Sequence, residues 1–273
     1  MDNTLQFNFS FPGSEKTEMV IAELDNIGFT GYETGDNYLH AFIPEPVFDE
    51  SAFEAICKKY GVSAQRTVIP PANWNEIWES GFEPVLVDDF CFIRAAFHPP
   101  GNGRTKFEVE ITPKMSFGTG HHATTFMMVQ LMREIDFAGK TVCDFGTGTG
   151  VLAILAEKMG ATEVLAVDYD ELCMENAAEN IAVNQCHHIQ TLQKDALPEG
   201  RWQVILANIN LNVLCANMEQ MARSLAGSGE LLLSGILATD KEVITRSLTD
   251  NNMKINTIIQ KDQWLAISAT VCC

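Results

Sequence analysis

The sequence predicts an α/β protein, with a doubly wound domain built on a mostly parallel sheet and a smaller α+β domain before it. From residue 141 onward, apolar strand patterns alternate with helical patterns, which is typical of a parallel sheet covered on both faces. The turn after the first of these strands carries three glycines at alternate positions. Residues 3–69 read instead as strand, helix, strand, strand, helix and strand, the order of a split βαβ, ferredoxin-like sandwich.

The small N-terminal domain is predicted to span residues 1–69. Its expected strands are the apolar or alternating segments 4–11, 29–34, 37–44 and 62–69. Its expected helices, 14–28 and 45–61, depend on apolar side chains that recur near helical spacing: Met19, Ala22 and Ile27 in the first, and Phe48, Phe53 and Ile56 in the second.

A linker helix is predicted for residues 70–84, where Trp74 and Trp78 lie one helical turn apart. Short extended runs at 85–97 and 104–111 follow, separated by the turn-rich segment HPPGNG. They predict a strand and a hairpin at the entrance to the second domain, residues 85–273.

The second domain is predicted to hold six strands, at 141–145, 163–168, 203–208, 230–235, 254–260 and 264–270. Helices are expected between them at 151–159, 170–184, 211–226 and 239–250, with Asp170 as an N-cap. The last two strands are close enough in sequence to form an antiparallel hairpin at one edge of the sheet.

Composition limits the partners and the compartment. The formal net charge is -18, and residues 1–60 alone carry eleven acidic and three basic side chains. Such a surface repels phosphate backbones and anionic membranes and attracts basic proteins. The alternative is that the acidic side chains serve only solubility. Eight scattered cysteines, no CxxC pair and no export signal predict reduced thiols, no metal site and a cytoplasmic protein.

The glycines follow the strand at 141–145 in the pattern D-x-G-x-G-x-G, from Asp144 through Gly146 and Gly148 to Gly150. Glycines after the first strand of such a fold let the backbone approach a ligand closely. A dinucleotide fingerprint would require glycine at position 151, where valine stands. A nicotinamide site, or a glycine-rich turn without any cofactor, are the alternatives that remain.

This pattern, together with Asp168 at the end of the next strand, resembles the class I S-adenosylmethionine-dependent methyltransferases, which have a Rossmann-like fold. The resemblance implies S-adenosylmethionine as cofactor. It implies that Asp144 and the three glycines of the loop belong to the cofactor site, and that Asp168 binds the ribose hydroxyls. A carboxylate suits that role because it accepts hydrogen bonds from two hydroxyls at once.

Two further stretches narrow the resemblance: MSFGTGHHATT at 115–125 and VILANIN at 204–210. With the linker NWNEIWESGFEPVLV and the later SGIL at 234–237, they closely resemble the bacterial family that methylates large-subunit ribosomal protein eleven, over the whole chain. The family's cofactor contacts then fall on Thr125, Gly146, Asp168 and Asn208. The resemblance also implies a basic protein substrate, recognised by the acidic small domain, and favours a monomer.

The acceptor chemistry is predicted from the stretch that begins with Asn208. Many amine-methylating relatives of the class have an aromatic residue at the fourth position of this motif, where the present chain has Leu211. A flexible aliphatic amine is therefore favoured over a planar base, with the carbonyl of Asn208 accepting from the amine. His121 and His122 are candidate general bases. The competing interpretation is that they position their loop or cap the next helix.

The leading prediction is a protein N-methyltransferase acting on lysine amines, and perhaps the α-amine, of large-subunit ribosomal protein eleven. One alternative is a methyltransferase of the same fold that acts on RNA or on a small-molecule amine, although the net charge argues against a direct nucleic-acid substrate. Another is a partner protein that binds S-adenosylmethionine without catalysis.

Overall fold

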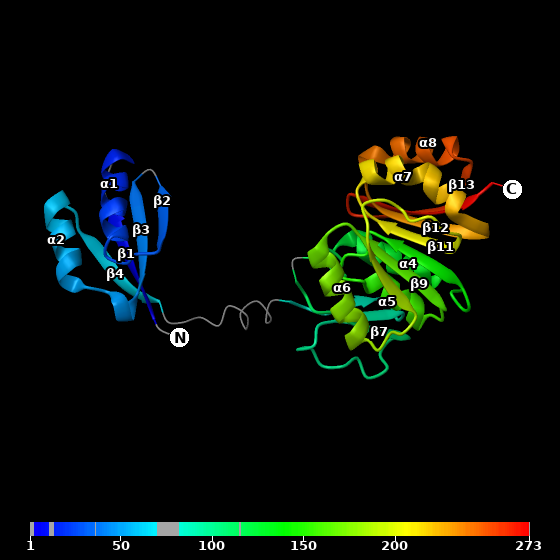
Figure 1. Ribbon diagram of the computed structural model, residues 1–273, viewed down its shortest axis with the longest axis horizontal. Helices are drawn as coiled ribbons and strands as arrows, with labels where there is room; N and C mark the ends of the chain where they lie inside the picture. Colours follow the sequence, from blue (N-terminus) through cyan, green and yellow to red (C-terminus); the bar gives the residue numbers. More distant parts are fainter. Residues whose placement is uncertain (1–2, 11–13, 36, 70–81, 115, 273) are drawn as a thin grey trace. The chain divides into compact units, whose positions relative to one another are not determined.

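The computed structural model describes residues 3–10, 14–35, 37–69, 82–114 and 116–272. The chain divides into two compact units, a small unit of residues 1–82 and a large unit of residues 83–273, each described by itself (Figure 1). The linker helix predicted for 70–84, including Trp74 and Trp78, lies outside the described residues except for its last three positions, which are not helical.

The small unit is a four-stranded antiparallel sheet with two helices. Its elements are β1 (Thr4–Ser10), α1 (Ser14–Asp25), β2 (Gly31–Gly35), β3 (Tyr38–Pro44), a 3-10 turn (Glu45–Val47), α2 (Glu50–Tyr60) and β4 (Ala64–Ile69). The strand order β2-β3-β1-β4 is that of a split βαβ sandwich. Asp49 begins α2 by accepting from Ser51 N and Ala52 N, and Gly61 ends it in the left-handed conformation.

One face of this sheet is buried. Alternate residues of β1, among them Phe7, pack with Phe29 and Phe53 in an aromatic cluster. The sequence placed Met19 on the helical repeat of α1, but Met19 is 50% exposed; the helix buries Val20 and Leu24 instead. The helix was predicted correctly, but the wrong face was assigned to the core. The first turn has too few apolar residues to show which face is buried.

The large unit contains a seven-stranded sheet in the order β10-β9-β8-β11-β12-β14-β13. The strands are β8 (Thr141–Phe145), β9 (Glu163–Asp168), β10 (Ile189–Gln193), β11 (Trp202–Asn208), β12 (Leu225–Leu237), β13 (Met253–Lys261) and β14 (Trp264–Val271). The helices are α4 (Ala123–Arg133), α5 (Val151–Lys158), α6 (Glu171–Val183), α7 (Leu211–Ser224) and α8 (Lys241–Asp250), with a 3-10 turn at Ala238–Asp240.

These helices cover both faces of the sheet. In Figure 1, α7 and α8 lie on one side of it and α5 and α6 on the other. The doubly wound α/β fold is therefore confirmed for the large unit. The predicted antiparallel pairing of the last two strands is also correct, with β13 at the edge and β14 between β12 and β13.

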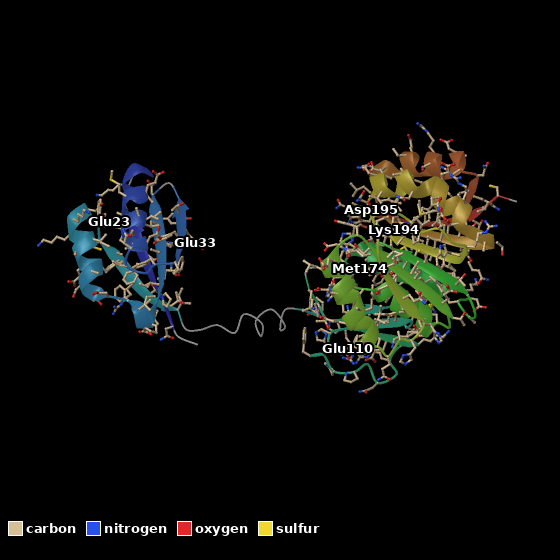
Figure 2. All side chains as sticks on the ribbon, viewed as in Figure 1. Glu23, Glu33, Glu110, Met174, Lys194 and Asp195 are labelled. Atoms are coloured by element: carbon tan, nitrogen blue, oxygen red, sulfur yellow. The ribbon has the colours of Figure 1, made fainter. Side chains whose placement is uncertain are left out.

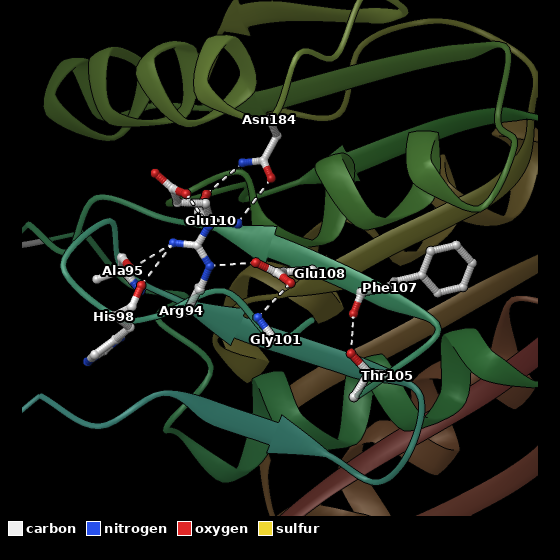
Figure 3. A network of polar contacts seen from close by, with 9 residues as sticks. All are labelled: Arg94, Ala95, His98, Gly101, Thr105, Phe107, Glu108, Glu110 and Asn184. Atoms are coloured by element: carbon white, nitrogen blue, oxygen red, sulfur yellow. Dashed lines mark hydrogen bonds and ion pairs between the residues drawn. The ribbon is translucent and has the colours of Figure 1, made fainter. Parts of the chain in front are cut away.

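The entrance to the large unit differs from the prediction. β5 (Val85–Val87), β6 (Cys91–Arg94) and β7 (Phe107–Glu110) form a separate sheet in which β5 and β6 are antiparallel, whereas β6 and β7 run parallel. The segment HPPGNG is thus part of a returning loop and not a hairpin turn. Arg94 of β6 stabilises this pairing, because its guanidinium reaches carboxylates on both Glu108 and Glu110 of β7 (Figure 3).

Strand β10 was missed entirely, because most of its side chains are polar or exposed and its sequence IQTLQ carries little apolar signal. Among the described residues, no helix is long and apolar enough to cross a membrane. The cysteines in the described part of the chain are free thiols.

Candidate active site

The loop between β8 and α5, residues 146–150 and hereafter the glycine loop, requires its glycines for steric reasons. Gly146 and Gly148 have φ of +79° and +55°, in the left-handed region. A Cβ on Gly148 would collide with the carbonyl oxygen of Phe117, and one on Gly146 with the side chain of Ile209. Close packing against Phe117 and Ile209 therefore excludes a side chain at either position.

Asp144, the last residue but one of β8, lies fully buried beneath the glycine loop. Its Oδ2 accepts from Thr147 Oγ1 at 2.7 Å and from Ala153 N at 3.2 Å, while its Oδ1 has no hydrogen-bond partner among the described residues. Burial raises the pKa of the Asp144 carboxyl to about 7, helped by the nearby charge of Asp168. This side chain braces the loop from below and does not line the cavity.

Asp168 ends β9 at the rim of the same loop and is 8% exposed. Its Oδ2 accepts from Gly148 N at 2.9 Å and its Oδ1 from Asp170 N at 3.2 Å. Asp170 in turn begins α6 by accepting from Leu172 N, as predicted. One carboxylate thus fixes the glycine loop and still presents its edge to the cavity.

Asn208 ends β11, on the opposite side of Gly146 from Asp168 in the order of the strands. Its Nδ2 donates to Thr125 Oγ1 at 3.3 Å, from a threonine fully buried in α4. Its Oδ1 is buried and has no partner among the described residues. Because an amide oxygen accepts two hydrogen bonds, this atom is an acceptor ready for a ligand.

The two histidines occupy different places. His121 is exposed, and its Nε2 lies 2.7 Å from the backbone oxygen of Glu83. Since a carbonyl only accepts, this nitrogen carries a proton. His122 caps α4, with Nδ1 accepting from Thr124 N at 3.4 Å and lying 2.7 Å from Thr124 Oγ1. His122 lines the cavity, while His121 holds the preceding loop to the start of the large unit.

A cavity of about 440 Å³ joins these groups along the carboxyl ends of the parallel strands, the usual ligand position in such sheets. Of the residues predicted from the sequence, it is lined by Gly146, Gly148, Asp168, Asn208 and His122. Asp144, Gly150 and Thr125 lie behind its walls and support them.

Sequence reasoning missed both ends of the cavity. Lys194 and Asp195, which follow β10, line one end and lie close together in Figure 2. Trp264, the first residue of β14, lines the other and packs edge-on against His122 at 4.8 Å between ring centroids. Phe117 packs against the same histidine at 5.1 Å. A correct strand at 189–193 would have identified the first pair as strand-end residues.

Comparisons with known proteins identify the family of the chain. The family model "Ribosomal protein L11 methyltransferase (PrmA)" matches residues 15–271. The chain belongs to the ribosomal protein L11 methyltransferase family. Relatives with that name include proteins of Porphyromonas gingivalis, 35% identical over 93% of this chain and 90% of theirs, and of Phocaeicola vulgatus, 35% identical over 94% of both chains.

Solved structures extend the likeness to the fold. The L11 methylase of Lactobacillus delbrueckii subsp. bulgaricus is 26% identical, with a TM-score of 0.64 over 69% of this chain and 98% of that one. A methyltransferase of Pyrococcus furiosus, 16% identical, shares the fold with a TM-score of 0.50, over 59% of this chain and 88% of that one. Family membership makes the present protein a methyltransferase and confirms the resemblance drawn from the sequence.

Proposed function

We propose that this protein transfers methyl groups from S-adenosylmethionine to lysine amines, and to the α-amine, of ribosomal protein L11. The observation that carries this proposal is the buried, unpartnered Oδ1 of Asn208 at the cavity wall. Such an acceptor suits an N–H group that must present its lone pair in a fixed direction. The names of the relatives support L11 as the protein that supplies this amine.

The cavity fits the cofactor. Its volume of about 440 Å³ lies in the usual range for small-molecule sites. Gly146 and Gly148 line the cavity with backbone alone, and Asp168 offers a carboxylate edge suited to ribose hydroxyls. Lys194 and Asp195 add polar groups at the same end. When bound, S-adenosylmethionine supplies a methyl group already activated on a positively charged sulfur.

The strand order gives the direction of the site. Asp168 on β9 and Asn208 on β11 lie on either side of β8. With ribose held at Asp168, the acceptor amine enters from the side of Asn208, where Phe117, His122 and Trp264 provide aromatic walls. Aromatic faces suit the aliphatic stem and the cationic head of a lysine side chain.

The chain's own contribution is alignment and desolvation. A lysine arrives protonated, because its reference pKa is about 10.4. Burial in the cavity and the positive sulfur of the bound cofactor would both lower the pKa of the amine, and the side-chain carbonyl of Asn208 would then orient the neutral nitrogen. We assign His122 to positioning rather than to proton removal, because its Nδ1 accepts from the first turn of α4, which leaves Nε2 with the proton.

We assign substrate recognition to the small unit, keeping the predicted domains 1–69, 70–84 and 85–273 and a cytoplasmic monomer as part of the proposal. Its excess of acidic side chains favours association with a basic ribosomal protein. Among the described residues, Glu18 and Glu54 are exposed acids on its two helices.

The test is transfer of labelled methyl from S-adenosylmethionine to purified L11, read by intact mass, with total RNA as a parallel substrate. Mass increases in single-methyl steps on L11 alone are expected. Label in RNA, or in neither substrate despite cofactor binding, would refute the assigned acceptor.

A further inference from the structure

Thr149 of the glycine loop uses every one of its polar groups to join neighbouring segments. Its N–H donates to Phe117 O at 3.0 Å and its hydroxyl to Gly118 O at 2.8 Å. Its carbonyl accepts from Asn180 Nδ2 of α6 at 2.8 Å. Thr149 and Asn180 are fully buried. A Cβ at Gly118 would lie 2.7 Å from the threonine hydroxyl, so the two loops are in direct contact.

Asn180 is equally committed on its other side. Its Oδ1 accepts from Thr112 N at 2.7 Å, while Asn176, one turn earlier, donates to Thr112 O at 3.1 Å. A carboxamide donates and accepts at the same time, which neither a carboxylate nor an apolar side chain of this size can do. Asn180, in α6, therefore links this helix to the glycine loop and to Thr112, in the segment that follows β7.

The three segments joined in this way each supply part of the cavity wall: Phe117 from the loop 116–122, Gly148 from the glycine loop, and Cys173 from α6. We propose that Thr149 and Asn180 are a positioning pair that fixes these three walls relative to one another. They thereby set the affinity for the cofactor and the alignment of the acceptor amine, while touching neither. The effect on the acceptor amine rests on the proposed function. The effect on the positions of the three walls does not depend on it.

The chain provides a matched control in Asn184, one turn beyond Asn180. Its side chain makes the same paired contact with a backbone, accepting from Glu110 N at 3.0 Å and donating to Glu110 O at 2.6 Å. It ties α6 to β7 but makes no contact with the glycine loop. A purely structural role would give Asn180 and Asn184 similar consequences when each is replaced.

The first experiment compares Thr149→Val, Thr149→Ser, Asn180→Asp and Asn184→Asp in the full chain. Thr149→Val keeps the side-chain volume but removes the hydroxyl, and Asn180→Asp loses the donor to Thr149 O. Both should weaken S-adenosylmethionine binding, measured by calorimetry, and lower kcat with L11, each by about 10- to 100-fold. Thr149→Ser should restore both values, and Asn184→Asp should change thermal stability without changing either. Equal losses in Asn180→Asp and Asn184→Asp would overturn the proposal.

The second experiment needs no cofactor or substrate. All five amides of residues 146–150 donate hydrogen bonds, so a peptide covering them reports on the loop by hydrogen exchange in the free protein. Exchange should become faster in Thr149→Val and Asn180→Asp and stay unchanged in Asn184→Asp. Unchanged exchange in the first two variants would refute the positioning role. If exchange becomes faster in these variants but the unmodified protein does not methylate L11, the positioning role is retained and the proposed function is refuted.

Discussion

Two polar clusters of the large unit differ in what they leave unpaired. Around Arg94, the guanidinium pairs with Glu108 and Glu110 and donates to the backbone oxygens of Ala95 and His98 (Figure 3). Around the cavity, buried oxygens of Asp144 and Asn208 have no partner among the described residues. An unpaired buried polar atom costs stability, so the first cluster contributes to the fold alone. In the second, Asp144 lies behind the cavity wall, and Asn208 lines the cavity, where its free oxygen is the acceptor in the proposed function.

The largest expected effect breaks the satisfied cluster. Arg94→Met removes a side chain that is 12% exposed and leaves two carboxylates without their partner. We expect a loss of about 3–5 kcal/mol in the free energy of unfolding of the large unit, measured by chemical denaturation. The exposed pair of Arg223 and Glu219 is the control, and Arg223→Met should cost less than about 1 kcal/mol. Similar losses of unfolding free energy in the two variants would show that the Arg94 cluster contributes no more to stability than an exposed ion pair.

The next effect concerns the unpaired acceptor. Asn208→Ala should lower kcat with L11 by about 100- to 1,000-fold, because the amine loses the group that orients it. Cofactor affinity should change much less. Equal loss of binding and turnover would mean that Asn208 holds the cofactor and not the acceptor.

Asp168 should show the opposite pattern. Asp168→Ala removes hydrogen bonds to a charged acceptor, so the Kd for S-adenosylmethionine should rise by about 10- to 100-fold without unfolding the protein. Glu171→Ala, an exposed acid in the first turn of α6, controls for the loss of a nearby charge. Unchanged affinity in Asp168→Ala would remove that residue from the site.

The last effect, spread over several pH units, is a pH dependence of stability from Asp144. Its folded-state pKa, about 7, lies above the ordinary value of 3.8, so the folded state binds more protons between these values and stability falls as pH rises through them. The slope is at most about 1.4 kcal/mol per pH unit. Asp144→Asn should abolish it, making the variant relatively more stable at pH 8 than at pH 4 in denaturation curves. A constant difference across this range would contradict a raised pKa.

Much of this contrast could be predicted from the sequence, for a physical reason. Asp144, the loop glycines, Asp168 and Asn208 lie at the ends of apolar strands, and strand ends in a parallel sheet meet at one edge. Lys194 and Asp195 were not found, because β10 is an edge strand whose polar side chains hide its periodicity. Trp264 was not found, because the predicted hairpin did not show which of its two strands pairs with β12 and brings its first residue to the cavity.

Contacts between segments far apart in the sequence could not be predicted either. The parallel pairing of β6 with β7 brings Arg94 to a carboxylate 14 residues later, a contact that no local turn signal reports. The same holds for the ladder from Asn180 to Thr112 and Thr149, where three asparagines at helical spacing look like an ordinary polar face. The exposure of His121 also depends on tertiary contacts.

The position of β14 has a consequence for folding on the ribosome. This strand pairs with β12 on one side and β13 on the other, although it is made after both. A nascent chain that stops before Trp264 leaves the apolar edge of β12 open, and an open edge invites pairing with other chains. Such an intermediate would also lack the aromatic wall beside His122. The chain therefore gains protection from aggregation and a complete cavity in the same late step of synthesis.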